Sequence, residues 1–167
     1  MPWLALLALV VLAASPAAAR GLTEAQVRAA LAAQGRAWDA GRLEGYAPDA
    51  VFVDQARAGD GRLVPYGRST LAEARAQARK AFARSRVRET RSVVGVAIAP
   101  DGRSAATRSR VVSRIETGGA TRTVCVERTQ TLALSGGRLL SKGQTDTVVR
   151  CPHPPAPRSA SAATSPG

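Results

Sequence analysis

The sequence has few of the residues on which several common kinds of functional site depend. Aromatic residues make up 4% of its 167 residues, so little is available for stacking on nucleic-acid bases. The only histidine, His153, lies in a Pro-rich C-terminal stretch, which excludes a Ser-His-Asp triad inside a folded domain. His153 and the two cysteines, Cys125 and Cys151, lack the spacing of a zinc site, and no Gly-rich phosphate loop occurs. The sequence therefore predicts neither a metal nor a cofactor.

Lysine is also scarce, because Lys80 and Lys142 are the only two and the other 22 of the 24 basic residues are arginines. Against 12 Asp and Glu residues, the formal net charge is +12. An excess of this size can indicate a polyanionic partner. The arginines are scattered rather than gathered in one block, which favours a compositional origin. Together with the shortage of aromatics, this argues against a nucleic-acid partner.

The one long apolar run is at the start of the chain. Residues 1–19 carry no charged side chain, residues 3–14 are almost entirely apolar, and Ala17-Ala18-Ala19 is typical of a signal-peptide cleavage site. We expect a signal peptide over residues 1–19 and a periplasmic or secreted protein. The alternative is an uncleaved membrane anchor, but the run is shorter than the roughly 20 residues that span a bilayer. After cleavage, 167 − 19 = 148 residues remain, which suits one domain without an integral membrane segment.

Two capping boxes predict two helices. Thr23-Glu24-Ala25-Gln26 begins a helix that ends near Gly41, and Thr70-Leu71-Ala72-Glu73 begins another that ends near Arg84. The apolar stripe of the first helix contains one polar residue, Gln34, which either hydrogen-bonds inside the core or points into a cavity.

Strands account for most of the rest of the predicted domain. A helical turn over 43–46, a strand over 50–54 and a Gly-rich loop over 57–66 are expected between the helices. Four strands separated by Asp-Gly and Gly-Gly turns follow the second helix, over 87–99, 104–116, 121–134 and 138–151. A Pro/Ser/Ala-rich tail over 152–167 is expected to be disordered. This order predicts an α+β domain over 20–151, in which a curved antiparallel sheet wraps around the N-terminal helices as a cone with a central cavity.

The two cysteines are expected to form a disulfide, because both would lie in an oxidising compartment. A two-residue turn at Gly136-Gly137 pairs residues whose numbers sum to 273, which places Cys125 opposite Val148, three residues before Cys151. A bond therefore needs a bulge, a longer turn or a bend at the end of the last strand. The alternative is two separate thiols.

The segments AWDAGRLEGYAPDAVFVDQ (37–55) and YGRSTLAEARAQARKAF (66–82), followed by the meander, resemble the nuclear transport factor 2-like superfamily, which includes the SnoaL-like and ketosteroid isomerase families. The resemblance covers residues 22–151. In ketosteroid isomerases an Asp that ends the first strand is the general base, and Asp54 is at the matching place. The resemblance puts Gln34 and Gln130 where those isomerases have a Tyr and a protonated Asp that stabilise the oxyanion. Glutamine is a less acidic donor, so ketosteroid isomerisation is disfavoured.

The resemblance and the local pattern together define a candidate pocket. We expect Gln34, Trp38, Asp54 and Gln130 to converge on one cavity, and the full candidate set is Gln34, Trp38, Tyr46, Phe52, Asp54, Tyr66 and Gln130. Asp54 is the candidate catalytic residue. The alternative for Asp54 is a polar residue that ends a strand in solvent. For Trp38, Phe52 and Tyr66 the alternative, which we favour, is a place in the core.

Arginines of the meander fall on defined strand faces. Arg108, Arg110 and Arg114 share one face, and Arg122 and Arg128 share a face of the next strand with Gln130. We favour a solvated convex surface for these arginines. If the face were concave, it would form an anion-binding cavity.

Three functions remain open. The first is an exported module that binds a small apolar or anionic ligand, the second an enzyme of the same fold with Asp54 as base, and the third an interaction protein that docks an anionic partner. We rank binding first because a complete catalytic set is missing, and whether the protein is an enzyme stays open. Repulsion among outer arginines predicts a monomer or a weak homodimer.

Overall fold

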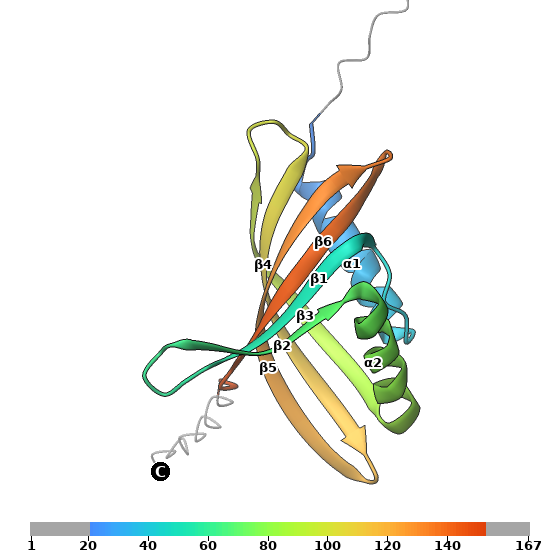
Figure 1. The fold of residues 1–167 in the computed structure, drawn as a ribbon, viewed down its shortest axis with the longest axis vertical. Coiled ribbons are helices and arrows are strands. Elements are labelled where there is room, and N and C mark those ends of the chain that lie inside the picture. The colour runs from blue at the N-terminus through green and yellow to red at the C-terminus, as the bar shows by residue number, and fades with distance from the viewer. Residues whose placement is uncertain (1–20, 153–167) are drawn as a thin grey trace, which may run out of the picture.

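The computed structural model describes residues 21–152, which form a six-stranded sheet and two helices (Figure 1). The leader expected over 1–19 and, apart from Pro152, the tail expected over 152–167 lie outside these residues. No helix among the described residues is long and apolar enough to cross a membrane. The elements in chain order are α1 (Glu24–Asp39), β1 (Tyr46–Arg57), β2 (Leu63–Thr70), α2 (Leu71–Arg84), β3 (Arg86–Ile98), β4 (Ser104–Thr117), β5 (Ala120–Ser135) and β6 (Arg138–Val149).

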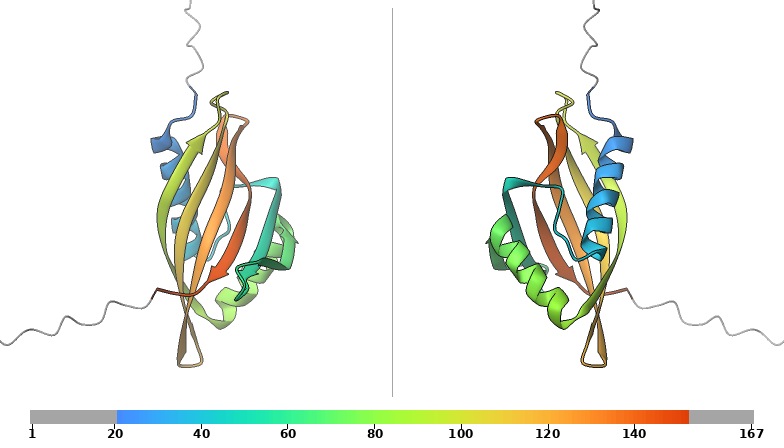
Figure 2. Two further views of the ribbon diagram at one scale, coloured as in Figure 1. Left: turned by 90° about the vertical axis from the view of Figure 1, so that its left-hand side faces the viewer. Right: turned by 90° about the vertical axis from the view of Figure 1, so that its right-hand side faces the viewer.

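The strands are ordered β2-β1-β6-β5-β4-β3 across the sheet. Neighbouring strands are antiparallel except β1 and β6, which run parallel. Both helices cover one face of the curved sheet (Figure 2). The predicted α+β class and cone-shaped arrangement are confirmed, with the β1–β6 pair as the one departure from an antiparallel sheet.

Both predicted capping boxes form. The Gln26 backbone N–H donates to Thr23 Oγ1 over 3.3 Å, and the Thr23 backbone N–H donates to Gln26 Oε1 over 2.8 Å. Thr70 and Glu73 exchange the same two bonds at the start of α2. These bonds satisfy backbone N–H groups that the first turn of a helix leaves free. Local sequence thus determines where each helix begins, and therefore which of its side chains face the sheet.

Two clusters of buried apolar side chains hold the helices on the sheet. One lies under α1 and the other joins β1 to α2. Burial of each large side chain contributes about 1.5–3 kcal/mol. The first cluster comprises Val27, Leu31, Ala105 and Leu132, and the second comprises Tyr46, Ala50, Phe52 and Leu71.

Two elements between the helices differ from those predicted. No helical turn forms over 43–46, because Tyr46 already begins β1 and packs its ring 4.9 Å from that of Phe52. The predicted loop over 57–66 is shorter, because β2 pairs with the edge of β1 in a hairpin that extends from the body of the sheet (Figure 1). Most β2 side chains are exposed, so no alternating burial marks it in the sequence.

A bulge in β6 changes the register of the last hairpin. Ser135 lies opposite Arg138 and Leu132 opposite Ser141, as the two-residue turn predicts. Beyond this point β6 contains one extra residue, so that Gln130 lies opposite Gln144. A one-residue change of register moves every later β6 side chain to the other face of the sheet.

Gly143 is required at this bulge for two reasons. Its φ of 140° lies in a region that favours glycine, and a Cβ there would overlap the carbonyl oxygen of Val51 in the adjacent β1. The close approach of the β1 backbone to β6 therefore depends on a residue without a side chain.

The predicted disulfide between Cys125 and Cys151 is confirmed, with the two Cα atoms 5.1 Å apart. The bulge is the feature that permits it. Cys125 lies opposite Val149 rather than Val148, and Cys151 follows two residues later, just past the end of β6. The bond ties the end of the last strand to β5.

We expect Gly143→Ala to destabilise the fold by more than about 2 kcal/mol, because it adds backbone strain and a clash with Val51. Gly95→Ala is the matched control, since Gly95 also lies in a strand but a Cβ there meets nothing within 4 Å. Urea denaturation gives both free energies of unfolding. Equal losses for the two variants would contradict the role of the bulge.

We expect loss of the disulfide to lower the free energy of unfolding by roughly 3.5 kcal/mol, since it closes a loop of 26 residues. Urea denaturation with and without reductant measures this effect. The double variant Cys125→Ser/Cys151→Ser is the control and should not respond to reductant. Alkylation of two thiols in native, unreduced protein would contradict the bond.

Candidate functional site

A cavity of about 360 Å³ lies between the inner face of the sheet and the two helices. This volume is near the lower end of the roughly 300–1,000 Å³ typical of ligand pockets. Much of its wall is apolar, and α1, α2 and the strands all contribute. The apolar lining includes Trp38, Leu43, Phe52, Ala78, Ile115 and Val126.

The sheet side of the cavity carries a buried ion pair. Arg128 donates from Nε and Nη2 to the two carboxylate oxygens of Asp146, each over 2.7 Å, and from Nη1 to Glu89 over 3.4 Å. The Arg128 side chain is only 8% exposed. Burial acts to lower the pKa of Arg128, but the charge and hydrogen bonds of Asp146, together with Glu89, raise it above its ordinary value. Arg128 is therefore a fixed cation with two carboxylate partners.

Further hydrogen bonds extend this ion pair into a connected polar floor. Tyr46 Oη donates to Gln144 Oε1 over 2.6 Å, and Gln144 Nε2 donates to Asp146 over 3.0 Å. On the other side, Ser113 Oγ donates to Glu89 over 3.1 Å. Burial raises the pKa of Tyr46, so its hydroxyl stays protonated as a donor. We call these six residues, Tyr46, Gln144, Asp146, Arg128, Glu89 and Ser113, the polar floor.

Asp54 lies next to this floor but is not part of its bonding. In the sheet Asp54 is the neighbour of Asp146, which is in turn the neighbour of Arg128. The carboxylate of Asp54 has no hydrogen-bond or salt-bridge partner among the described residues, although the side chain lines the cavity and is half-buried. Burial and then the charge of Asp146 raise its pKa, against a smaller opposing effect of Arg128. Its carboxyl group is therefore free to bind or take a proton from a ligand.

Gln34 and Gln130 are hydrogen-bonded to each other rather than directed together at the cavity. Gln130 Nε2 donates to Gln34 Oε1 over 3.2 Å, and Gln34 Nε2 donates to the Gly45 carbonyl over 3.0 Å. Gln34 still lines part of the cavity, whereas Gln130 is not among its lining residues. The polar residue in the stripe of α1 is thus explained by the hydrogen bonds that both ends of its amide group make, whereas Gln130 Oε1 is buried without a partner among the described residues.

The structure places the other candidate residues as follows. Trp38, Tyr46 and Phe52 line the cavity with Gln34 and Asp54. Tyr66 does not, because it is the extra residue of a β2 bulge opposite Asp54 and Gln55 and is 64% exposed. Tyr66 is therefore neither a core residue nor a wall of this cavity.

The arginines separate between the two faces of the sheet. Arg108, Arg110 and Arg114 are exposed on the face of β4 that points away from the helices, as expected of a solvated surface. Arg128 points inward, and Arg122 lies on the same side at an exposed position that lines the cavity. The inner face therefore does carry cations, as in the alternative of an anion-binding cavity.

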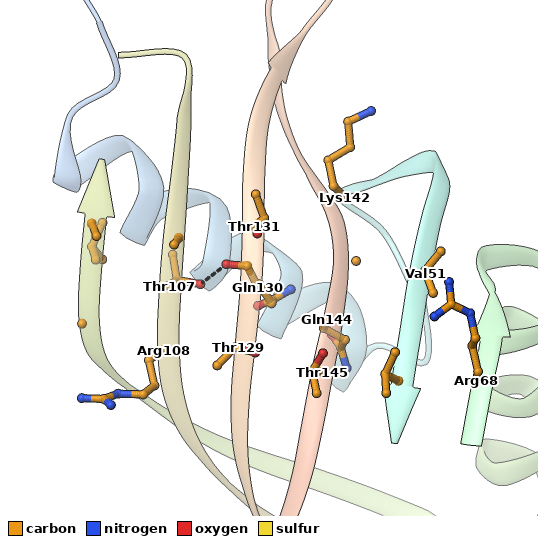
Figure 3. A pocket seen from close by; sticks show the side chains of 16 residues that line it. Val51, Arg68, Thr107, Arg108, Thr129, Gln130, Thr131, Lys142, Gln144 and Thr145 are labelled. Carbon is orange, nitrogen blue, oxygen red and sulfur yellow. Dashed lines mark hydrogen bonds between the residues drawn. The ribbon is translucent and has the colours of Figure 1, made fainter. Parts of the chain in front are cut away.

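The outer face has a shallow groove of about 710 Å³, seen in Figure 3 with α1 behind the sheet. Thr129, Thr131 and Thr145 lie across it, and Arg68 and Arg108 lie at opposite ends (Figure 3). Lys142, also at its margin, forms an exposed ion pair with Asp49 over 3.1 Å. The groove is open to solvent and separate from the cavity on the helical side.

Sequence reasoning missed Glu89, Arg91, Gln144 and Asp146, which all line the cavity. For the two β6 residues the reason is the bulge. Without it, the register set by the turn would pair Arg128 with Thr145, and the side chain of Asp146 would point outward. The charges offered a signal, because a register displaced by one residue places the acidic Asp146 opposite Arg128. Glu89 and Arg91 point inward and alternate with outward residues of β3. They were missed because charged side chains on alternate positions of a strand usually face solvent.

Comparison with known proteins supports the fold and not a particular activity. No known protein family matches the sequence, and no curated protein does either. Among solved structures, a conserved protein from Planctomyces limnophilus is similar with a TM-score of 0.61 and 18% identity over 75% of this chain and 95% of its own.

Two further solved structures are similar at the same level. A ketosteroid isomerase-like protein from Erwinia carotovora atroseptica has a TM-score of 0.55 and 15% identity, over 77% of this chain and 94% of its own. A protein from Catenulispora acidiphila, solved in complex with S-DNPA, has a TM-score of 0.52 and 19% identity, over 74% of this chain and 91% of its own. These similarities, all under 25% identity, show that the chain shares the fold of these proteins, among them a ketosteroid isomerase-like protein, as the resemblance implied.

We expect Asp146→Asn to lower the free energy of unfolding by about 3–5 kcal/mol, because it leaves buried Arg128 without its closest counter-charge. Asp49→Asn is the matched control: it breaks the exposed ion pair with Lys142 and should leave the free energy of unfolding nearly unchanged, because solvent screens such a pair. Urea denaturation at neutral pH compares the two. A loss for Asp146→Asn no larger than that of the control would contradict the buried pair.

Proposed function

We propose that this protein is an exported small-ligand-binding domain of the SnoaL-like type, and that its ligand occupies the cavity between the helices and the sheet. The observation that carries this proposal is the composition of that cavity. Much of its wall is apolar, and six of its polar residues form the hydrogen-bonded polar floor. Ligand pockets combine these two features, because apolar walls supply binding energy and a few fixed polar groups supply orientation.

Export is supported by two observations. The leader over residues 1–19 has the pattern of a signal peptide, and the disulfide between Cys125 and Cys151 is of a kind that persists in oxidising compartments. The site of action is then the periplasm or the extracellular space.

Native mass spectrometry of protein isolated from the periplasmic or culture fraction tests the proposal. We expect a small molecule to co-purify and to be lost from Ala78→Leu, because Ala78 lines the cavity from α2 and a larger side chain fills the space. Ala72→Leu on the exposed side of α2 is the matched control and should retain the molecule. Equal occupancy of the two variants would rule out this cavity as the binding site.

The alternative of an enzyme with Asp54 as general base is supported by one feature of the same cavity. Asp54 is an unpartnered carboxylate with a raised pKa, and a pKa nearer to the working pH suits a general base. Against it, Gln34 and Gln130 bond to each other and so do not provide the pair of oxyanion donors that an isomerase of this fold uses.

The variant Asp54→Asn distinguishes the two functions. A binding module retains its co-purified molecule in this variant and shows no conversion of it in either form. For an enzyme, the wild type converts the molecule, and Asp54→Asn still binds it but loses most of the turnover, by the 10²–10⁴-fold typical of a positioned base.

A further inference from the structure

Arg91 is an unpaired cation in the cavity. It lies on the inner face of β3, between Glu89 and Val93, and lines the cavity. Among the described residues no carboxylate lies within salt-bridge distance of it. Its one hydrogen bond runs from Nη1 to the Leu31 carbonyl over 3.4 Å, and its Nε is buried without a partner.

The neighbouring charges compensate Arg91 only in part. Glu89, the nearest acid along β3, is already bonded to Arg128 and Ser113. Burial, followed by the like charge of Arg128, lowers the pKa of Arg91, against smaller opposing effects of Tyr46, Glu89 and Asp146. A half-buried guanidinium without a bonded counter-ion among residues 21–152 is unfavourable, because no direct ion pair repays the desolvation of its charge. An anion in the cavity would supply the missing partner.

Asp54, the carboxylate of the cavity that is not bonded to Arg128, limits where such an anion can lie. Asp54 is on β1, and β6, β5 and β4 separate that strand from β3 in the sheet. A ligand with one anionic group is therefore attracted to the Arg91 side and repelled from the Asp54 side. Apolar side chains such as Trp38, Leu43 and Phe52 line the space that the rest of the ligand would occupy.

We infer that the ligand of this cavity is a small monocarboxylate with an apolar body, whose carboxylate is bound by the guanidinium of Arg91. The inference rests on the proposed function, since it names the ligand class for the same cavity. A planar guanidinium suits this role because its parallel N–H groups match the two oxygens of a carboxylate.

Isothermal titration calorimetry with octanoate, 1-octanol and octylamine tests the inference on the purified protein. The three probes share an apolar chain and differ in the charge of the head group. We expect octanoate to bind at least tenfold more tightly than 1-octanol, and octylamine to bind most weakly, because a charge-assisted hydrogen bond is stronger than a neutral one.

Three variants assign the preference to Arg91. Arg91→Gln should reduce the ratio of octanoate to 1-octanol affinity to about one, while Arg91→Lys should preserve part of it. Arg108→Gln removes an arginine from the outer face of β4 and should leave the ratio unchanged. Thermal denaturation confirms that each variant is folded, and the comparison of probes on the wild type does not depend on any variant.

The outcomes separate the ligand class from the function. If 1-octanol binds the wild type as tightly as octanoate does, or if Arg91→Gln keeps the full ratio, the inference is overturned while the cavity remains a binding site. If none of the three probes binds the wild type and no molecule co-purifies, both the inference and the proposed function are overturned.

Discussion

The single extra residue in β6 determines more of this structure than any other local feature. Up to Leu132 and Ser141 the last hairpin follows the register of its turn, and beyond the bulge every β6 residue is displaced by one. Without that displacement Gln144 and Asp146 would point to the outer face, and Arg128 would be a buried cation without its main partner. The same displacement puts Cys151 on the same side as Cys125, and the glycine in the bulge allows β1 to approach β6. The polar floor, the disulfide and the attachment of β1 therefore share one cause.

The features that could be predicted from the sequence are those with local causes. Thr23 with Gln26 and Thr70 with Glu73 define both helix starts because their hydrogen bonds span three residues. The four strands of the meander follow from Gly-containing turns. β2 and its pairing with β1 were missed, because an edge strand with mostly exposed side chains has no burial pattern of its own.

For the candidate site, the limit of prediction was again register. Alternation correctly places Asp54, Arg128 and Gln130 on one face, but which residues of β6 and β3 meet them depends on pairing between distant segments. Tyr66 was misplaced because a bulge in β2 turns it outward. A bulge is a change of one residue in a backbone ladder, and composition does not reveal it.

The two faces of the sheet use arginine differently. Outside, Arg88 and Arg114 lie directly opposite each other in neighbouring strands, which is tolerable only in solvent, where their charges are screened. Inside, Arg128 is bonded to two carboxylates, whereas Arg91 forms no ion pair within the part of the chain that the structure describes. A net charge of +12 produces a positive field around the molecule, which raises the local concentration of small anions and speeds their encounter with the cavity.

The parallel pairing of β1 with β6 has a consequence for how the chain folds. Val53 is paired with Thr145, so β1, which is synthesised first among the strands, can pair with its neighbour β6 only after β6 has been synthesised. Contacts between such distant segments form late, because a large loss of chain entropy precedes any gain. Strands β3–β5 and the β1–β2 hairpin can form earlier from local contacts, but the cavity has no closed wall until β6 lies between β5 and β1. A nascent chain that lacks β6 therefore lacks the strand that joins β1 to β5, and with it Gln144 and Asp146 of the cavity wall.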